Sequence, residues 1–188
     1  MERYSQNRFY KLNVIIVKTV TFYVDASFEV PKKDIQYLMD YLFSVEEWGR
    51  YELWLFTNST GLMTLETLKT FTSEMLKSTQ FYKDIPENRK RILQMLLNVI
   101  GTCLEKGDMQ DAFKFLHQFG QLCQPEVDVM EAILFKYYQG YYAYQNGSSK
   151  GIADMEKCAE MMTFLDIYDL ARQMTDEIDR LKKKLGKV

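Results

Sequence analysis

The sequence predicts an all-α protein built from antiparallel helix pairs, with about nine helices in a single domain spanning residues 1–188. Its 188 residues include only three prolines and nine glycines, which argues against a turn-rich β fold. Along most of the chain, apolar residues recur at every third or fourth position, as on the buried side of an amphipathic helix. A third indication is a repeat of about 40 residues in the spacing of three glycines.

Four helices are expected in the first part of the chain. The first runs from about Glu2 to Val24, and the second begins at Pro31 in "PKKDIQYLMDYLF". The third runs from about Val45 to Asn58, and "TLETLKTFTSEMLKS" supplies a fourth that can pack beside it. These segments predict helices that pair with their neighbours in sequence.

The clearest helical pattern lies in "PENRKRILQMLLNVIGTCLEKG", residues 86–107. Pro86 and Glu87 suit the first turn of a helix, and Gly107 suits a left-handed cap at its end. The apolar stripe between them consists of Ile92, Met95, Leu96, Val99, Ile100 and Cys103.

The rest of the chain continues as helix pairs. Asp108 can cap "DMQDAFKFLHQFGQLC", which would form a helical hairpin with the preceding helix. A similar pair follows: "EVDVMEAILFKYYQGYYAYQNG" ends at Asn146 and Gly147, and Ser148 or Ser149 can cap "SKGIADMEKCAEMMTFL". The tail "YDLARQMTDEIDRLKKKLGKV" predicts a last helix, acidic early and basic late, which suits the helix dipole.

Three glycines mark the repeat. Gly61, Gly101 and Gly140 are 40 and 39 residues apart, and Asn58 and Asn98 each stand three residues before their glycine. Such a period is typical of helix-pair solenoids, in which a small residue lets the two helices of a unit approach closely. Because the strict tetratricopeptide pattern is absent, we expect a tetratricopeptide-like, right-handed solenoid.

The same register predicts a ligand-binding face. In a helix-pair solenoid the first helices of the pairs line the concave side, so their residues outside the core are the natural ligand contacts. Asparagine both donates and accepts hydrogen bonds and can pair with a peptide backbone, whereas Trp and Tyr offer apolar area with a polar edge. The predicted peptide-binding residues are Tyr51, Trp54, Asn58, Arg91, Gln94, Asn98, Tyr137, Tyr141 and Tyr144.

A simpler interpretation stays open for these residues. Asn58 and Asn98 could cap or bridge neighbouring helices, and the aromatic residues could belong to the core. The tyrosines also divide by position around their helix. Tyr138 and Tyr142 lie about 100 to 120° around the helix from Tyr137, Tyr141 and Tyr144 and are expected to pack against the second helix of their pair.

Composition and motifs argue against an enzyme. The single histidine, His117, has no Cys, Asp or Ser placed beside it by short spacing, and no phosphate-binding loop or metal-binding motif is present. We therefore expect no catalytic residues, no metal and no cofactor. The net charge of −2 gives no general attraction to nucleic acid, and the basic end "RLKKKLGKV" suits the terminus of a helix.

Two features indicate a soluble, cytoplasmic protein. Cys103, Cys123 and Cys158 are far apart and odd in number, as expected for reduced thiols. The apolar stretch "LNVIIVKTVTFYV" is interrupted by Lys18 and is too short to span a membrane. We expect no membrane partner.

The segment Tyr37–Ser59, "YLMDYLFSVEEWGRYELWLFTNS", resembles the Rgg/GadR/MutR family of Gram-positive transcriptional regulators, most specifically in "DYLFSVEEWG-x-YE". The resemblance covers nearly the whole chain and weakens towards Val188. It implies a helical-repeat domain that forms a homodimer and, in several members, binds a short imported signalling peptide on its concave face. Family members also carry a helix-turn-helix domain that binds DNA. We expect that domain, and the first repeat helices, to be absent from this chain.

One position departs from the family pattern. Asn58 matches an asparagine that peptide-sensing members keep, but the arginine that some of them place three residues later is Gly61 here. The resemblance implies a quorum-sensing, peptide-binding regulatory domain. The alternative is a truncated interaction scaffold that forms a heterodimer with a full-length regulator.

Overall fold

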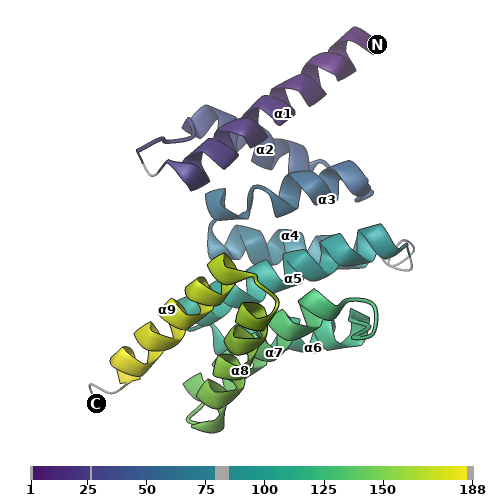
Figure 1. The fold of residues 1–188 in the computed structure, drawn as a ribbon. Helices are drawn as coiled ribbons and strands as arrows, with labels where there is room; N and C mark the ends of the chain where they lie inside the picture. The colour runs from purple at the N-terminus through teal and green to yellow at the C-terminus, as the bar shows by residue number, and fades with distance from the viewer. Residues whose placement is uncertain (1, 26, 79–84, 186–188) are drawn as a thin grey trace. The chain divides into compact units, whose positions relative to one another are not determined.

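The computed structural model describes residues 2–25, 27–78 and 85–185. Over these residues it contains nine α-helices, one 3₁₀ turn at Thr60–Leu62 and no β-strand (Figure 1), which confirms the all-α prediction and the expected number of helices. The helices are α1 (Glu2–Val24), α2 (Lys32–Phe43), α3 (Arg50–Thr57), α4 (Leu65–Ser78), α5 (Pro86–Lys106), α6 (Met109–Leu122), α7 (Val129–Gln145), α8 (Lys150–Phe164) and α9 (Tyr168–Leu185). Every helix within these ranges is too short or too polar to cross a lipid bilayer.

One predicted helix boundary is wrong. Helix α3 begins at Arg50 rather than at about Val45, because the chain turns at residues 45–49 to bury Trp48. The indole is 1% exposed, and its ring centroid lies 5.3 Å from that of Phe56 and 6.2 Å from that of Phe71. A helix through this segment would lose that aromatic packing.

The chain divides into two compact units, residues 1–98 and 99–188, and the boundary falls inside α5. The first unit contains α1 to α4 and the start of α5. Its core combines the aromatic cluster of Trp48, Phe56 and Phe71 with leucines from α1, α2 and α3. These side chains come from successive helices, as expected where each helix packs on its neighbours in sequence.

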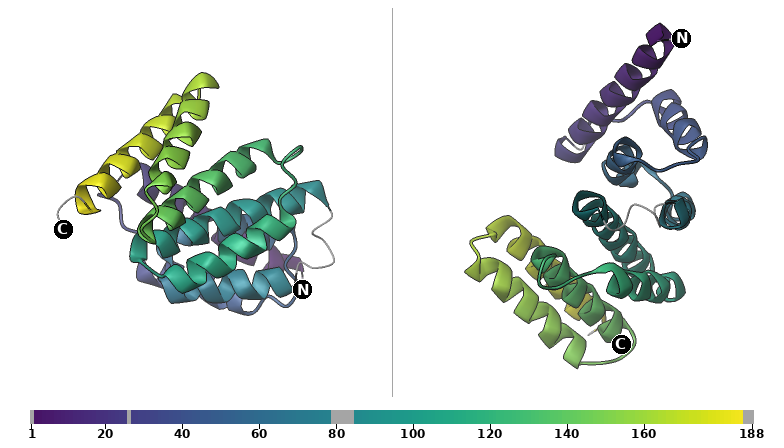
Figure 2. Two further views of the ribbon diagram at one scale, coloured as in Figure 1. Left: turned by 90° about the horizontal axis from the view of Figure 1, so that it is seen from below. Right: turned by 90° about the vertical axis from the view of Figure 1, so that its right-hand side faces the viewer.

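The second unit contains the rest of α5 and helices α6 to α9. Helices α7 and α8 pack together, and α9 lies along α8 (Figures 1 and 2). Asp108 caps α6 as predicted, since its carboxylate accepts a hydrogen bond from the Asp111 N–H at 3.2 Å. Ser149 precedes α8 but its side chain forms no capping hydrogen bond, so of the two predicted alternatives, Ser148 or Ser149, the second is wrong.

The repeat glycines all lie at close approaches, although to different partners. A Cβ atom on Gly61 would lie 2.7 Å from the Tyr23 ring, and one on Gly101 would lie 2.8 Å from the Tyr138 hydroxyl. A Cβ atom on Gly140 would lie 2.7 Å from the backbone oxygen of Gly151. The sequence register therefore marks positions where the helix surface must stay small.

Candidate functional site

The predicted binding residues divide between the two units. Six lie in α3, at its end or in α5, within residues 1–98, and three belong to α7 in residues 99–188. Within the first unit, the Arg50 guanidinium lies 2.6 Å from the Glu87 carboxylate. Because these residues stand in the first turns of α3 and α5, the beginnings of the two helices lie side by side.

Tyr51 of α3, one of the predicted peptide-binding residues, contacts α1. The Tyr51 hydroxyl donates a hydrogen bond to the side-chain oxygen of Asn13 at 2.9 Å, and the Tyr51 ring contacts Phe9 edge-on at 5.1 Å. Trp54 stacks on Tyr51 at a centroid distance of 5.9 Å and is half-buried. Trp54 also borders an apolar cavity of about 490 Å³ formed with one side of α1.

Asn58 uses part of its hydrogen-bonding capacity within its own helix. Its side-chain nitrogen donates to the Trp54 carbonyl at 2.7 Å, and the residue ends α3. This agrees with the simpler interpretation of a helix-terminal residue. Its side-chain oxygen accepts no bond from the described residues and is the atom that an incoming peptide N–H could reach.

The space beside Gly61, where some family members place an arginine, is occupied by Tyr23 of α1. The Tyr23 hydroxyl accepts a hydrogen bond from the Gly61 N–H at 2.9 Å. Any side chain at residue 61 would meet the Tyr23 ring, which must then move. The tyrosine is 52% exposed and lies at the surface, so this part of the first unit presents a phenol instead of a cation.

Helix α5 presents the more open row. Arg91 and Gln94 are half-buried and Asn98 is exposed, and their spacing of three and four residues places them on one side of the helix. Arg91 lies 3.7 Å from Glu87 on the preceding turn. Its buried Nε donates no hydrogen bond among the described residues. The side chain as a whole is 24% exposed, and a guanidinium group favours a carbonyl or carboxylate acceptor.

The tyrosines of α7 are placed differently from the prediction. Tyr137 and Tyr141 are only 5% and 4% exposed, because α9 covers this side of α7. The Tyr137 hydroxyl donates to the Met174 carbonyl at 3.2 Å, and the Tyr141 hydroxyl donates to the Glu177 carboxylate at 3.1 Å. The expectation of an open tyrosine face is therefore wrong for these two residues. Tyr144 is half-buried and lies close to Gly151.

Tyr137 and Tyr141 keep their hydroxyl protons and therefore act as hydrogen-bond donors. Burial, reinforced by the Glu177 carboxylate, raises the pKa of Tyr137 and of Tyr141 above the usual value of a phenol. Both hydroxyls stay protonated at neutral pH and continue to donate to α9.

Packing was correctly predicted for the other two tyrosines, but the expected partner was wrong. Tyr138 packs on Gly101 of α5, and the Tyr142 ring lies 5.9 Å from Phe113 of α6. Burial raises the pKa of Tyr138 to about 12. These two residues therefore join α7 to the preceding helix pair, whereas α8 packs on Gly140.

Sequence reasoning missed the polar cluster on α9. A cavity of about 320 Å³ lies beside Tyr137 and Tyr141, where Glu177 and Arg180 form an ion pair and Glu105 and Asp176 add two more carboxylates. Met174, Glu177 and Arg180 are spaced by three residues along α9, and that spacing marks one helix face. This spacing is present in the sequence, but charged residues at the same spacing also occur on ordinary solvent-exposed helix faces.

The described residues offer no candidate metal centre. That part of the chain holds no cluster of three His, Cys, Asp or Glu side chains that could bind a metal ion. His117 is exposed on α6, and Cys103, Cys123 and Cys158 form no disulfide with one another.

Comparison with solved structures shows the same fold in bacterial regulators. The SHP pheromone receptor Rgg2 of Streptococcus dysgalactiae superposes with a TM-score of 0.83 at 23% identity, over 96% of this chain and 68% of the receptor. A cysteine-to-serine variant of that receptor gives a TM-score of 0.81 at 23% identity, over 94% and 64%. A transcriptional regulator from Listeria monocytogenes EGD-e gives 0.79 at 16% identity, over 98% and 66%. The chain thus spans about two thirds of the length of these proteins.

The sequence itself matches a family model. Residues 1–176 match the C-terminal domain of the HTH-type transcriptional regulator Rgg, which agrees with the resemblance found in Tyr37–Ser59. This family consists of domains of transcription regulators and is not a family of enzymes. The chain belongs to the Rgg C-terminal domain family.

Proposed function

We propose that this chain is the ligand-sensing domain of an Rgg-type transcriptional regulator and that it binds a short peptide. The observation that carries the proposal is the α5 row, where the half-buried side chain of Arg91 stands on the same side of the helix as the amides of Gln94 and Asn98. Such groups suit a peptide backbone, which presents both donors and acceptors. Two similar structures are those of a pheromone receptor, which supports a peptide as the ligand class.

Each residue of the first unit has a distinct role in this proposal. Gln94 and Asn98 pair with backbone groups of the peptide, and Arg91 pairs with a carboxylate. Trp54 and Tyr51 provide apolar area, and Asn58 offers its side-chain oxygen, which accepts no hydrogen bond from the described residues.

The tyrosines of the second unit have other roles. Tyr137 and Tyr141 act by holding α9 against α7, because their hydroxyls donate to Met174 and Glu177. Tyr144 is half-buried, and its predicted contact with a ligand is a separate proposal that concerns the second unit alone.

Regulation would follow from linked equilibria. The domain forms a homodimer in the cytoplasm and reaches DNA only through a helix-turn-helix domain outside this sequence. A peptide that binds one dimer arrangement better than another shifts the population towards that arrangement. The proposed function involves neither catalysis nor a cofactor.

A second candidate is an interaction scaffold that pairs with a full-length regulator. It is favoured by the apolar side chains on the surface of α1, where Tyr10 is 70%, Val17 is 66% and Val24 is 84% exposed. These residues recur at intervals of seven, which is the spacing of a helix-to-helix contact. If this candidate is correct, the chain captures a regulator without binding a peptide.

The peptide proposal is tested by affinity selection from a pool of randomised octapeptides, followed by calorimetry with the selected sequence. Gln94→Ala and Asn98→Ala each remove a hydrogen-bonding amide and should weaken binding by about tenfold. Gln110→Ala changes an exposed glutamine on α6 and serves as the matched control, with unchanged affinity expected. Equal affinity in all three variants, with intact helicity, would contradict the proposed site.

A further inference from the structure

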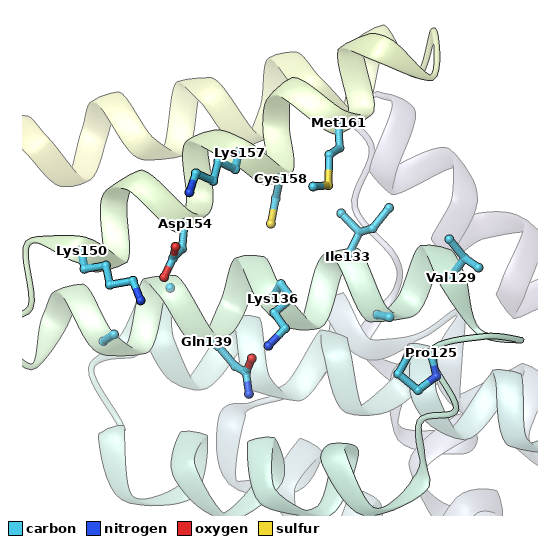
Figure 3. A pocket seen from close by; sticks show the side chains of 13 residues that line it. Pro125, Val129, Ile133, Lys136, Gln139, Lys150, Asp154, Lys157, Cys158 and Met161 are labelled. Atoms are coloured by element: carbon cyan, nitrogen blue, oxygen red, sulfur yellow. The ribbon is translucent and has the colours of Figure 1, made fainter.

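A cavity lies in the other unit, between α7 and α8. This α7–α8 groove has a volume of about 710 Å³ and is lined by both helices along most of their length (Figure 3). Asp154, Cys158 and Met161 project from α8 towards α7, where Ile133 faces them. The volume falls in the range of roughly 300–1,000 Å³ that holds small-molecule ligands.

Small residues on α7 create the groove. Gly140 and Gly151 bring the two backbones together, since a Cβ atom on Gly151 would lie only 2.3 Å from the Gly140 oxygen. Ala132 and Ala143 line the same side of α7 and do not fill the space above it. The groove is therefore fixed by the sequence of α7 and by the tight helix crossing rather than by a movable loop.

The polar groups of the groove carry excess positive charge. Lys136, Lys150 and Lys157 line it, and Asp154 is its single carboxylate, so three cations face one anion. None of the three lysines forms an ion pair with another described residue. This contrasts with the whole chain, whose net charge is −2. An anionic group in the groove would gain attraction that no protein carboxylate supplies.

The walls of the groove are apolar and lead to an apolar rim. Val129 and Met161 line the end distant from Lys150, and they are 55% and 50% exposed. Phe164 and Leu165 follow Met161 in the sequence and are 87% and 49% exposed. A ligand with an apolar tail could therefore bury that tail against the apolar side chains at this end of the groove.

We propose that the α7–α8 groove binds an amphipathic anion, namely a carboxylate that carries an acyl chain. The carboxylate lies among Lys136, Lys150 and Lys157, and the chain follows the apolar wall towards Met161. The site uses a different side of α7 from the buried tyrosines, whose hydroxyls bond to α9. Its lining residues belong to residues 99–188, whereas the proposed peptide-binding row on α5 belongs to residues 1–98.

The test uses dodecanoate below its micellar concentration as the probe, with binding to the full chain measured by calorimetry. The double variant K136Q/K157Q removes two cations from the groove and should weaken binding by at least about tenfold. The matched control K32Q/K33Q makes the same charge change on exposed lysines of α2 and should bind normally. Dodecanol, which lacks the charge, should also bind at least about tenfold more weakly than dodecanoate.

Chemical labelling locates the bound chain independently. Cys158 lines the groove, so dodecanoate should slow its alkylation by N-ethylmaleimide, while the half-buried Cys123 should react at an unchanged rate. A second variant, Ala132→Phe, fills the groove without altering charge and should abolish binding while circular dichroism stays unchanged.

Several results would overturn the proposal. Equal binding to K136Q/K157Q and to K32Q/K33Q, or equal binding of dodecanol, would show that the lysines do not select an anion. An unchanged alkylation rate at Cys158 would place the probe elsewhere. If dodecanoate fails to bind but an acidic amphipathic peptide binds and loses affinity in K136Q/K157Q, the groove is a protein-docking site instead. None of these outcomes affects the peptide test, which uses variants in the first unit.

Discussion

Asn58 and Tyr137 occupy equivalent positions in the repeat, two periods apart, yet their surroundings differ completely. Asn58 is half-buried at the end of α3 and keeps one side-chain oxygen free of partners among the described residues. Tyr137 is 5% exposed beneath α9 and donates its hydroxyl proton to a backbone carbonyl. A shared register therefore fixes which side of a helix a residue occupies, but the next helix in space decides whether that side is open.

The two regions also differ in how their repeat glycines are used. Gly140 faces the backbone of α8, which cannot move without shifting a whole helix. Gly61 faces the ring of Tyr23, which lies at the surface and can rotate away. Glycines at equivalent repeat positions thus allow a rigid helix crossing in the second unit and a contact with a movable side chain in the first.

The largest expected effect is the difference in stability between Gly140→Ala and Gly61→Ala. Gly140→Ala places a Cβ atom 2.7 Å from the Gly151 oxygen and should destabilise the protein by roughly 3 kcal/mol, as in overpacked cores. Gly61→Ala should cost less than about 1 kcal/mol because Tyr23 can give way. Urea denaturation followed by circular dichroism measures both.

Gly120→Ala on α6 is the control for these two variants. Its added Cβ would lie 3.5 Å from the Phe135 ring, an ordinary contact, so the variant should gain about 0.5 kcal/mol from helix propensity. If Gly140→Ala proved as stable as Gly120→Ala, the α7–α8 crossing would not be as tight as the structure shows.

The covered tyrosines predict a loss of stability in alkali. The pKa of Tyr137 and of Tyr141 is raised by burial and by Glu177, so the native state holds these protons more tightly than the unfolded chain. Their contribution is complete below about pH 10, the phenol pKa of an unfolded chain, and is lost as the pH rises above it. Each phenol should lower the free energy of unfolding by up to about 1.4 kcal/mol per pH unit.

Unfolding midpoints at pH 9 and pH 11 measure this dependence. In the double variant Y137F/Y141F, the unfolding midpoint should fall less steeply with pH. Part of the fall should remain, because the pKa of other buried phenols such as Tyr41 is also raised. The same decline in the parent and in the double variant would exclude these two tyrosines as its source.

Much of the fold could be predicted from the sequence because helices are local. Apolar periodicity located all nine described helices, and the limits of α1 and α5 agree with the prediction within a residue. The start of α3 could not be predicted, because it depends on Trp48 reaching Phe71 of a later helix. Local patterns predict helices, but distant contacts decide where some of them begin.

The candidate site was less predictable for a related reason. The register correctly placed Arg91, Gln94 and Asn98 on one face of α5. It did not show that α9 would cover Tyr137 and Tyr141, since the interaction between α7 and α9 joins residues 36 and 37 positions apart. The sequence also did not predict that the lysines meet in the α7–α8 groove. Lys136 belongs to α7 and Lys150 and Lys157 to α8, and their separation in sequence does not show that these helices bring them together.

The smallest expected effect compares one hydroxyl in each region. Tyr137→Phe removes a buried hydrogen bond to the Met174 carbonyl and should cost about 1 kcal/mol in free energy of unfolding. Tyr51→Phe removes a more exposed bond to Asn13 and should cost less than about 0.5 kcal/mol, because water can replace the lost partner. Urea denaturation at pH 7 resolves the two values. If Tyr51→Phe were the more damaging variant, the hydrogen bond between α3 and α1 would stabilise the protein more than the buried bond between α7 and α9, contrary to the difference in exposure between the two hydroxyls.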